Sequence, residues 1–263
     1  MADKLVRRAF SCRREGLTIR GTIYRLPGEE PRPAAIVCHG FMATQGSVRQ
    51  YARALALRGW TACCFDFCGG SVAFGKSDGA TCDMSVKTEV RDLLAVIAAL
   101  QARPDVSAGK LLLASHSQGA LVAALTAAQL GTKVTHLAML APALCIPDDA
   151  RAGQMMFARF DPANIPERIH CGPMLLGRCY PADVLDMNPF AEIAVYPGDV
   201  LIFHGTEDGI VKPAYAQRAL AAYEQRPYGS VALHMMDGAG HTFSRREDRE
   251  IIAQLADFAR PGA

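Results

Sequence analysis

The sequence predicts an α/β fold in which a mostly parallel sheet is flanked by helices and carries an inserted cap. Apolar segments of strand length alternate with amphipathic segments of helix length, which is typical of βαβ units. The chain has 263 residues, the size of one such domain. Residues 142–195 break the alternation and hold seven of the fifteen prolines. We therefore expect a single domain over residues 1–263, with residues 142–195 forming a cap or lid within it.

The elements are expected in the following order. Residues 5–26 alternate apolar and polar side chains around Glu15-Gly16, which indicates an antiparallel hairpin. Short apolar runs then predict strands at residues 34–38, 60–67, 110–114, 134–140, 200–203 and 230–236. Segments with helical periodicity predict helices at residues 47–58, 85–102, 118–130, 213–225 and 246–258. The second of these helices is capped by Asp83 or Ser85 and ends before Pro104.

Composition and charge argue against several classes of protein. The net charge is +2 without a block of like charges, so no nucleic-acid partner is expected. The N-terminal residues lack the apolar core of a secretory signal, and the most apolar stretch, residues 119–131, is too short to cross a bilayer. The nine cysteines include no Cys-x-x-Cys pair, so we expect no metal site and no cofactor. A cytoplasmic protein with reduced thiols and no membrane partner is expected.

The segment KLLLASHSQGA, residues 110–120, joins an apolar strand directly to a helix at Ser117. A sharp strand–turn–helix junction lifts the side chain at the turn above the sheet when small residues flank it. Ser115 and Gly119 occupy the flanking positions of the Gly-x-Ser-x-Gly pattern, with serine in place of the first glycine. We interpret Ser117 as a nucleophile and the N–H of Gln118 as a donor to developing negative charge. An ordinary strand-to-helix turn is the alternative interpretation.

The segment VCHGF, residues 37–41, follows the strand near the start of the chain. This architecture takes the second donor of an oxyanion hole from that position, and the N–H of Phe41 is the candidate. Gly40 permits close approach of the backbone. We expect His39 to hold the loop by hydrogen bonding rather than to act as a base.

Two further loops supply an acid and a base. The strand at residues 200–203 leads into HGTED, in which Asp208 is preferred to Glu207 because the longer glutamate is expected to face solvent. A simple turn role for Asp208 is the alternative. His241 lies in the glycine-rich segment MDGAGHTF, after the last expected strand. Of the seven histidines, His234 and His241 follow Asp208 in the order Ser, Asp, His that this scaffold requires, and His234 is expected to be structural or exposed.

Residues 70–77, GSVAFGKS, match the Walker A string of nucleotide-binding loops and follow an expected strand. Asp78-Gly79 interrupts the helix that should begin at Lys76-Ser77, and Asp78 would bring negative charge close to a bound phosphate. The next helix begins too late to direct its N-terminus at the loop. These features favour an ordinary loop over a nucleotide-binding site.

The chain resembles the feruloyl (cinnamoyl) esterases of the α/β-hydrolase superfamily from about residue 16 to residue 258. The likeness lies in these segments: HGF at 39–41, FDF…GKSDG at 65–79, HSQG at 116–119, LAPA at 140–143, HGTED at 204–208 and GAGH at 238–241. It implies the α/β-hydrolase fold, with Ser117 as nucleophile, His241 as base and Asp208 as the orienting acid. It also implies that Phe41 and Gln118 supply the oxyanion N–H groups. In that family the GKSDG-type string is a loop and binds no nucleotide.

The resemblance also assigns the cap. Residues 142–195 correspond to the family's inserted cap over the acyl pocket, and Asp149 and Tyr180 match the cap residues that hold a phenolic hydroxyl. Ser115, Ala120 and the extra residues in CGGSVAFG depart from the family pattern, and the cap is rich in cysteine and methionine. These departures concern the preferred acyl group more than the reaction.

The expected activity is hydrolysis of carboxylic esters through an acyl-enzyme, with hydroxycinnamoyl or similar small acyl groups as substrates. The expected partner is a small-molecule ester, and a homodimer is left open. An acylglycerol lipase, a thioesterase or a peptidase on the same three residues is the alternative among enzymes. From another class, a non-catalytic protein that binds acyl ligands is the alternative.

Overall fold

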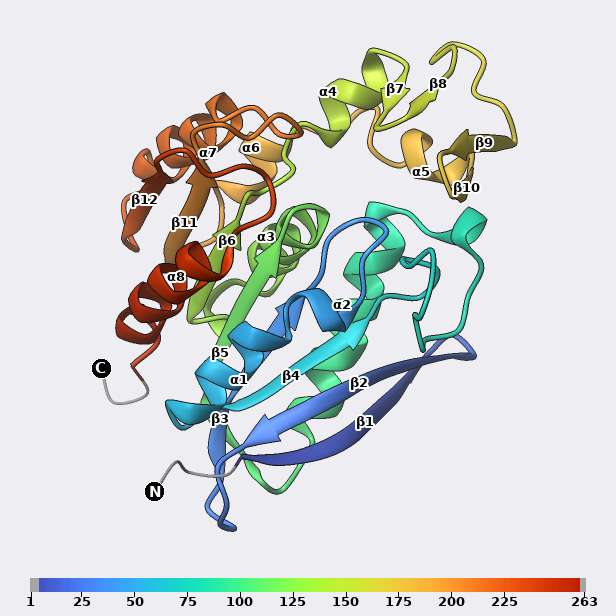
Figure 1. Ribbon diagram of the computed structural model, residues 1–263. Helices are drawn as coiled ribbons and strands as arrows, with labels where there is room; N and C mark the ends of the chain where they lie inside the picture. Colours follow the sequence, from blue (N-terminus) through green and yellow to red (C-terminus); the bar gives the residue numbers. More distant parts are fainter. Residues whose placement is uncertain (1–4, 261–263) are drawn as a thin grey trace.

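The centre of the protein is an eight-stranded sheet in the order β1-β2-β4-β3-β5-β6-β11-β12 (Figure 1). The computed structural model describes residues 5–260. The strands are β1 (Val6–Arg14), β2 (Leu17–Arg25), β3 (Arg32–Cys38), β4 (Thr61–Asp66), β5 (Val106–His116), β6 (His136–Leu140), β11 (Asp199–Gly205) and β12 (Val231–Met236). β2 pairs antiparallel with β1 and β4, whereas the other neighbours pair in parallel. The predicted N-terminal hairpin and mostly parallel sheet are confirmed.

Helices cover both faces of the sheet. One face packs against α1 (Arg49–Leu57) and α8 (Arg245–Phe258), and the other against α2 (Val86–Gln101), α3 (Gln118–Leu130) and α7 (Ala214–Glu224). These helices lie within two residues of the predicted bounds at each end. α2 begins with a capping box, in which the side-chain oxygen of Ser85 accepts from the backbone N–H of Thr88 and the side-chain oxygen of Thr88 accepts from the backbone N–H of Ser85. Of the two expected caps, Ser85 is therefore the one used.

The carboxyl ends of the parallel strands bring distant loops together. β3 and β5 are neighbours in register, with Cys38 opposite Ser115, so the loops that follow them lie side by side. β11 and β12 are likewise neighbours, with Gly205 opposite Met236. Because parallel strands all point the same way, the four expected site loops leave the same edge of the sheet.

Between β6 and β11 the chain leaves the sheet over residues 142–195, which we call the cap segment. It contains α4 (Ile146–Arg151), β7 (Gln154–Met155), β8 (Ala158–Arg159), β9 (Arg168–Cys171), β10 (Met174–Gly177), α5 (Cys179–Ala182) and α6 (Pro189–Ile193). In Figure 1, α4, α5 and β7–β10 gather at the top of the view. Ser85 Oγ donates to Asp183 Oδ2 at 2.5 Å, and Thr81 Oγ donates to the carbonyl of Leu175 at 2.6 Å. These bonds tie the cap segment to the segment before α2.

The Walker-like segment, residues 70–77, is an irregular loop from which no helix begins. The next helical turn is the short 3₁₀ segment Thr81–Asp83, and α2 follows only at Val86. Asp78 is engaged by the N–H of Thr18 at 2.9 Å and by Arg20 at 2.6 Å. The loop therefore packs on the N-terminal hairpin and offers no helix N-terminus to a phosphate.

Within residues 5–260, no helix combines the length and apolarity needed to cross a membrane. The same residues hold no cluster of three or more His, Cys, Asp or Glu side chains suited to a metal ion.

Candidate active site

Ser117 occupies a strained turn between β5 and α3. Its φ of 57° and ψ of −124° lie in a region that L residues rarely adopt, at a cost of about 1–3 kcal/mol. The backbone N–H of Ser117 donates to the carbonyl of Leu140 at 2.9 Å, and its carbonyl accepts from the N–H groups of Ala120 and Ala143. The bonds to β6 and to the start of the cap segment fix the turn, so the hydroxyl stands above the edge of the sheet.

Gly119 and Gly40 permit the loop after β3 to pass beside this turn. A Cβ at Gly119 would lie 2.3 Å from the carbonyl oxygen of His39, and a Cβ at Gly40 would lie 2.8 Å from Cβ of Ser117. Both distances are shorter than any real contact, so side chains at these positions would force the two loops apart.

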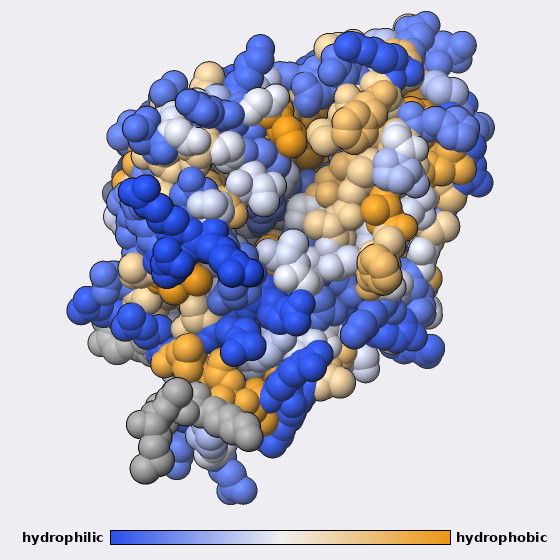
Figure 2. Space-filling model, in the orientation of Figure 1, coloured by the Kyte–Doolittle hydropathy of each residue, from blue (hydrophilic) through white to orange (hydrophobic). Residues whose placement is uncertain are grey.

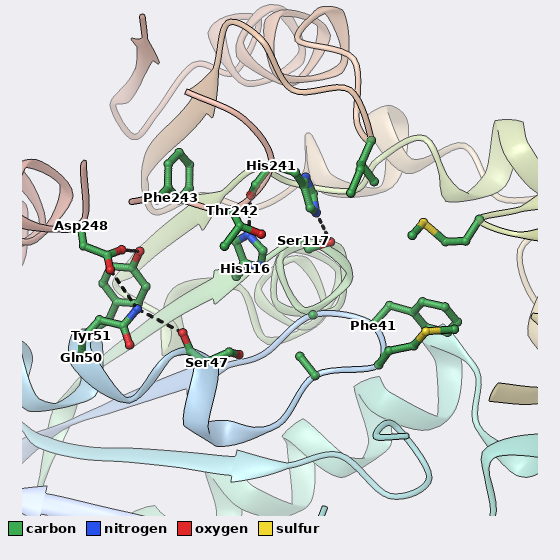
Figure 3. Close-up of a pocket in the computed structure, with 15 residues that line it drawn as sticks. Phe41, Ser47, Gln50, Tyr51, His116, Ser117, His241, Thr242, Phe243 and Asp248 are labelled. Carbon is green, nitrogen blue, oxygen red and sulfur yellow. Dashed lines mark hydrogen bonds between the residues drawn. The ribbon is translucent and has the colours of Figure 1, made fainter. Parts of the chain in front are cut away.

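The structure joins Ser117, His241 and Asp208 in one hydrogen-bonded chain (Figure 3). His241 Nε2 lies 2.9 Å from Ser117 Oγ, and His241 Nδ1 lies 2.8 Å from Asp208 Oδ2. A carboxylate only accepts, so Nδ1 carries the proton that it donates to Asp208, and Nε2 is left to accept from the serine hydroxyl. The three loops predicted from sequence thus meet with the geometry of a nucleophile, a base and an orienting acid.

Asp208 is held as a carboxylate. Its Oδ1 accepts from the N–H groups of Ile210 and Val211, both at 2.9 Å, and His204 Nε2 lies 3.2 Å from Oδ2. Burial by itself raises the pKa of Asp208, but the hydrogen bonds from His204, His241 and Val211 overcome burial and hold the pKa well below its usual range. The neighbouring Glu207 is exposed, as expected.

Two further histidines contact backbone groups of the loops around Ser117. Burial lowers the pKa of His116 to about 4, so its ring is neutral, and its Nε2 lies 2.9 Å from the carbonyl oxygen of His241. His39 Nδ1 lies 2.8 Å from the carbonyl oxygen of Gly40, and Nε2 accepts from the N–H of Phe67 at 3.1 Å. The expectation that His39 pins the oxyanion loop agrees with these contacts.

The N–H groups of Phe41 and Gln118 take part in no hydrogen bond within the described residues. Phe41 follows Gly40, which lies against Ser117, and Gln118 follows Ser117 directly. Both free donors therefore belong to residues beside Ser117, one at the start of α3 and one in the loop after β3.

The side chain of Gln118 links α2 to the cap segment, a connection that the sequence reasoning missed. Its Nε2 donates to Glu89 Oε2 at 2.9 Å, and its Oε1 accepts from the hydroxyl of Tyr180. Burial raises the pKa of Glu89 to about 8. The available signal was an acidic residue on a helix face otherwise formed by apolar side chains at Val86, Leu93 and Val96.

Two cavities meet at Ser117, and both are lined by Phe41, Met156 and Ile210. The larger, about 310 Å³, extends past His241 toward α1 and α8. The smaller, about 50 Å³, lies between Ser117 and the cap segment. Figure 2 shows hydrophobic side chains gathered around a hollow beside the cap segment.

Both cap residues singled out from the sequence line the smaller cavity. Tyr180 is buried and its hydroxyl is engaged by Gln118, whereas Asp149 is half-buried, with a pKa raised by burial. The rest of the lining escaped sequence reasoning because it comes from the cap segment and from the loop after β11: Ala143, Cys145, Ile146, Met155, Met156, Ile210 and Val211.

Comparison with known proteins places this chain in a family. The sequence profile of the family described as "Serine aminopeptidase, S33" matches residues 29–170, which is more than half of the chain. No curated protein matches the sequence.

Solved structures give a consistent picture of the fold. Est1E from Butyrivibrio proteoclasticus with bound ferulic acid superposes with a TM-score of 0.85, at 24% identity over 95% of this chain and 97% of that one. An esterase domain of a Rhodothermus marinus protein gives a TM-score of 0.71 at 20% identity, over 97% of this chain and 98% of that one. The esterase Pf2001 of Pyrococcus furiosus gives 0.71 at 18% identity, over 97% and 91%. The chain belongs to the serine aminopeptidase family S33 and is a hydrolase of the α/β-hydrolase superfamily.

Proposed function

We propose that the protein hydrolyses carboxylic esters through an acyl-enzyme on Ser117, with His241 as base and Asp208 as the orienting acid. The observation that carries the proposal is the continuous chain of hydrogen bonds, at 2.9 Å and 2.8 Å, through the three side chains. The proposal needs no metal and no organic cofactor, because the nucleophile, base and oxyanion donors all come from the chain.

In the first step Ser117 Oγ attacks the ester carbonyl while His241 Nε2 accepts the hydroxyl proton. The N–H groups of Phe41 and Gln118 stabilise the oxyanion of the tetrahedral intermediate, and each donor contributes roughly 10²–10³ in rate. His241 then protonates the alcohol as it leaves. In the second step His241 activates a water that releases the acid and regenerates Ser117.

For the acyl group we propose a hydroxycinnamoyl or similar small aromatic acid. Two observations support this choice: the fold is similar to that of Est1E, whose structure holds ferulic acid, and Asp149 and Tyr180 line the cavity beside the nucleophile. The cavity of about 50 Å³ is smaller than such a group, so the flexible side chains of Met155 and Met156 must move for it to enter.

The test compares the wild type with Ser117→Ala on p-nitrophenyl esters, together with labelling by a fluorophosphonate probe. We expect the variant to fold and to lose both turnover and labelling. Full activity in the variant would refute the role of Ser117, and an unreactive serine in a folded wild type would favour a non-catalytic acyl-binding protein.

A peptidase is the second candidate, because the matching family is described as a serine aminopeptidase. Steady-state kinetics on aminoacyl p-nitroanilides, thioesters and acylglycerols distinguishes a peptidase, a thioesterase and a lipase from the proposed esterase. We expect feruloyl and related esters to be hydrolysed with the highest kcat/KM. A higher kcat/KM for the anilides would replace the esterase proposal by the peptidase.

A further inference from the structure

The position of His241 decides which cavity receives each half of an ester. The alcohol oxygen must accept its proton from His241 Nε2, so the alcohol leaves on the side of the histidine. The larger cavity is lined by His241 and His116, whereas the smaller one contains neither and adjoins Gln118. The cavity of about 310 Å³ thus receives the alcohol, and the side chains that line its far end determine which alcohols bind. This assignment rests on the proposed function.

Four polar side chains lie together in the alcohol cavity, away from Phe41 and the smaller cavity (Figure 3). Ser47 comes from the 3₁₀ turn before α1, and Gln50 and Tyr51 come from the first turn of α1. Asp248 comes from the first turn of α8. We call these four residues the Asp248 cluster. Tyr51 is buried, whereas Gln50 and Asp248 are half-buried.

The hydrogen-bond donors of the Asp248 cluster are already used within the protein. The hydroxyl of Tyr51 donates to Asp248 Oδ1, and Ser47 Oγ donates to the carbonyl of Thr44 at 2.9 Å. Gln50 Nε2 donates to the carbonyl of Ser47 at 3.1 Å and to Asp248 Oδ2 at 3.4 Å. If the amide of Gln50 were flipped, its oxygen would face these two acceptors, so the network fixes the orientation of the amide.

What remains for a ligand is a set of acceptors. They are the carboxylate of Asp248, the phenolic oxygen of Tyr51, the amide oxygen of Gln50 and the hydroxyl oxygen of Ser47. A ligand group that only accepts hydrogen bonds would meet four acceptors and no free donor within the cluster. The cluster therefore selects a group that donates several hydrogen bonds.

The charge of the cluster indicates which donor group it binds. Within residues 5–260, no Lys or Arg side chain forms an ion pair with Asp248. Asp248 lies near the N-terminus of α8, where the helix dipole stabilises a carboxylate. The carboxylate thus faces the cavity without a cationic partner.

We propose that the Asp248 cluster binds a primary ammonium group carried by the alcohol half of the ester. An ammonium has three N–H donors and a positive charge, which match the acceptors and the carboxylate together. A neutral hydroxyl offers one donor and no charge. A quaternary ammonium offers charge but no donor, so it matches only Asp248.

The experiment uses esters of one acid with ω-aminoalkyl alcohols of four to six carbons and their n-alkyl and ω-hydroxyalkyl counterparts. Wild type is compared with Asp248→Asn, which keeps the acceptor for Tyr51 but removes the charge. Glu250→Gln is the matched control, because Glu250 is exposed on the same helix and does not line the cavity. We expect at least one aminoalkyl ester to exceed its alkyl counterpart in kcat/KM by about tenfold in wild type and in the control. In Asp248→Asn this ratio should fall to near one, mainly through KM.

Equal kcat/KM values for aminoalkyl and alkyl esters in the wild type would overturn the proposal, as would a ratio that survives in Asp248→Asn. A preference for the hydroxyalkyl esters would assign the cluster to a polyol instead. Turnover of the neutral alkyl esters reports on the proposed esterase separately. If no ester is turned over, calorimetry measures the binding of the free ω-amino alcohols to wild type and to Asp248→Asn. Weaker binding to the variant supports the ammonium site, and equal binding or none to the wild type overturns it.

Discussion

Gln118 Nε2 donates to Glu89 Oε2 at 2.9 Å, so the residue after Ser117 is anchored through its side chain to a buried acid of α2. The other end of the same amide accepts from Tyr180 of the cap segment. The backbone N–H of Gln118, proposed as an oxyanion donor, is thus held in place from two sides. This buried connection leads to the first of four predictions.

Glu89→Gln should change how stability depends on pH. The native state keeps a proton on Glu89 up to about pH 8, whereas the unfolded chain releases it near its ordinary value of 4.5. The folded state therefore binds more protons between these values, and this contribution to the free energy of unfolding falls as pH rises from about 4.5 to 8. The fall amounts to about 5 kcal/mol at most.

Glutamine reproduces the acceptor of the protonated acid and cannot ionise, so Glu89→Gln should remove that fall. Urea denaturation of both proteins at several pH values measures the difference in the free energy of unfolding. We expect the advantage of the variant to grow toward pH 8 and then to level off. A difference that does not vary with pH would show that Glu89 ionises in the native state as it does in the unfolded chain.

Asp208→Asn should lower kcat by about 10⁴-fold while the protein stays folded. The N–H groups of Ile210 and Val211 would retain the amide oxygen and so turn the NH₂ group toward His241. His241 Nδ1 would then have to accept, Nε2 would carry the proton, and Nε2 could not accept a proton from Ser117. Steady-state kinetics on a p-nitrophenyl ester measures the loss.

Glu207→Gln is the control for this prediction, since Glu207 is the adjacent acid and is exposed. Its kcat should match the wild-type value. A large loss in Glu207→Gln with little change in Asp208→Asn would exchange the roles of the two acids.

Gly119→Ala should destabilise the protein and reduce activity together. The new Cβ would lie 2.3 Å from the carbonyl oxygen of His39 and 3.1 Å from Cβ of Cys38, so β3 and its loop must move away from α3. Such overpacking costs about 1–3 kcal/mol, and the movement would displace Phe41 from the nucleophile. Thermal unfolding and kcat measure the two effects.

Gly209→Ala provides the comparison, because a Cβ there meets nothing within 4 Å. It should leave the melting temperature and kcat close to wild type. If Gly119→Ala behaves in the same way, the close approach of the two loops is not what requires a glycine.

Met155→Ala should shift the acyl preference toward larger acids. Met155 is buried and lines the smaller cavity beside the nucleophile, so truncation enlarges the space for the acyl group. The cost in stability should be about 2–5 kcal/mol. We expect the ratio of kcat/KM for feruloyl over acetyl esters to rise.

Met174→Ala separates this effect from general loosening of the cap segment. Met174 is equally buried there but does not line the smaller cavity. It should lose comparable stability without a change in the acyl ratio. A similar rise in both variants would place the selectivity in cap movement rather than in cavity size.

The sequence alone determined the order of the strands of the large sheet and of the helices that cover it, the turn at Ser117 and the three loops that meet there. These features depend on local patterns: apolar periodicity predicts strands and helices, and small residues around Ser117 and Gly40 permit close backbone approach. Parallel strands then carry their following loops to one edge whatever the details of packing.

Only the tertiary structure decided how the cavities are divided and what lines them. Gln118 meets Glu89 across 29 residues and Tyr180 across 62, and Tyr51 meets Asp248 across 197. Nothing in the local pattern at either end of such a pair indicates its partner, because the contact depends on how α1, α2, α8 and the cap segment pack around the sheet. The turn at Ser117 is therefore evident from a short segment, whereas the side chains that surround it depend on the whole fold.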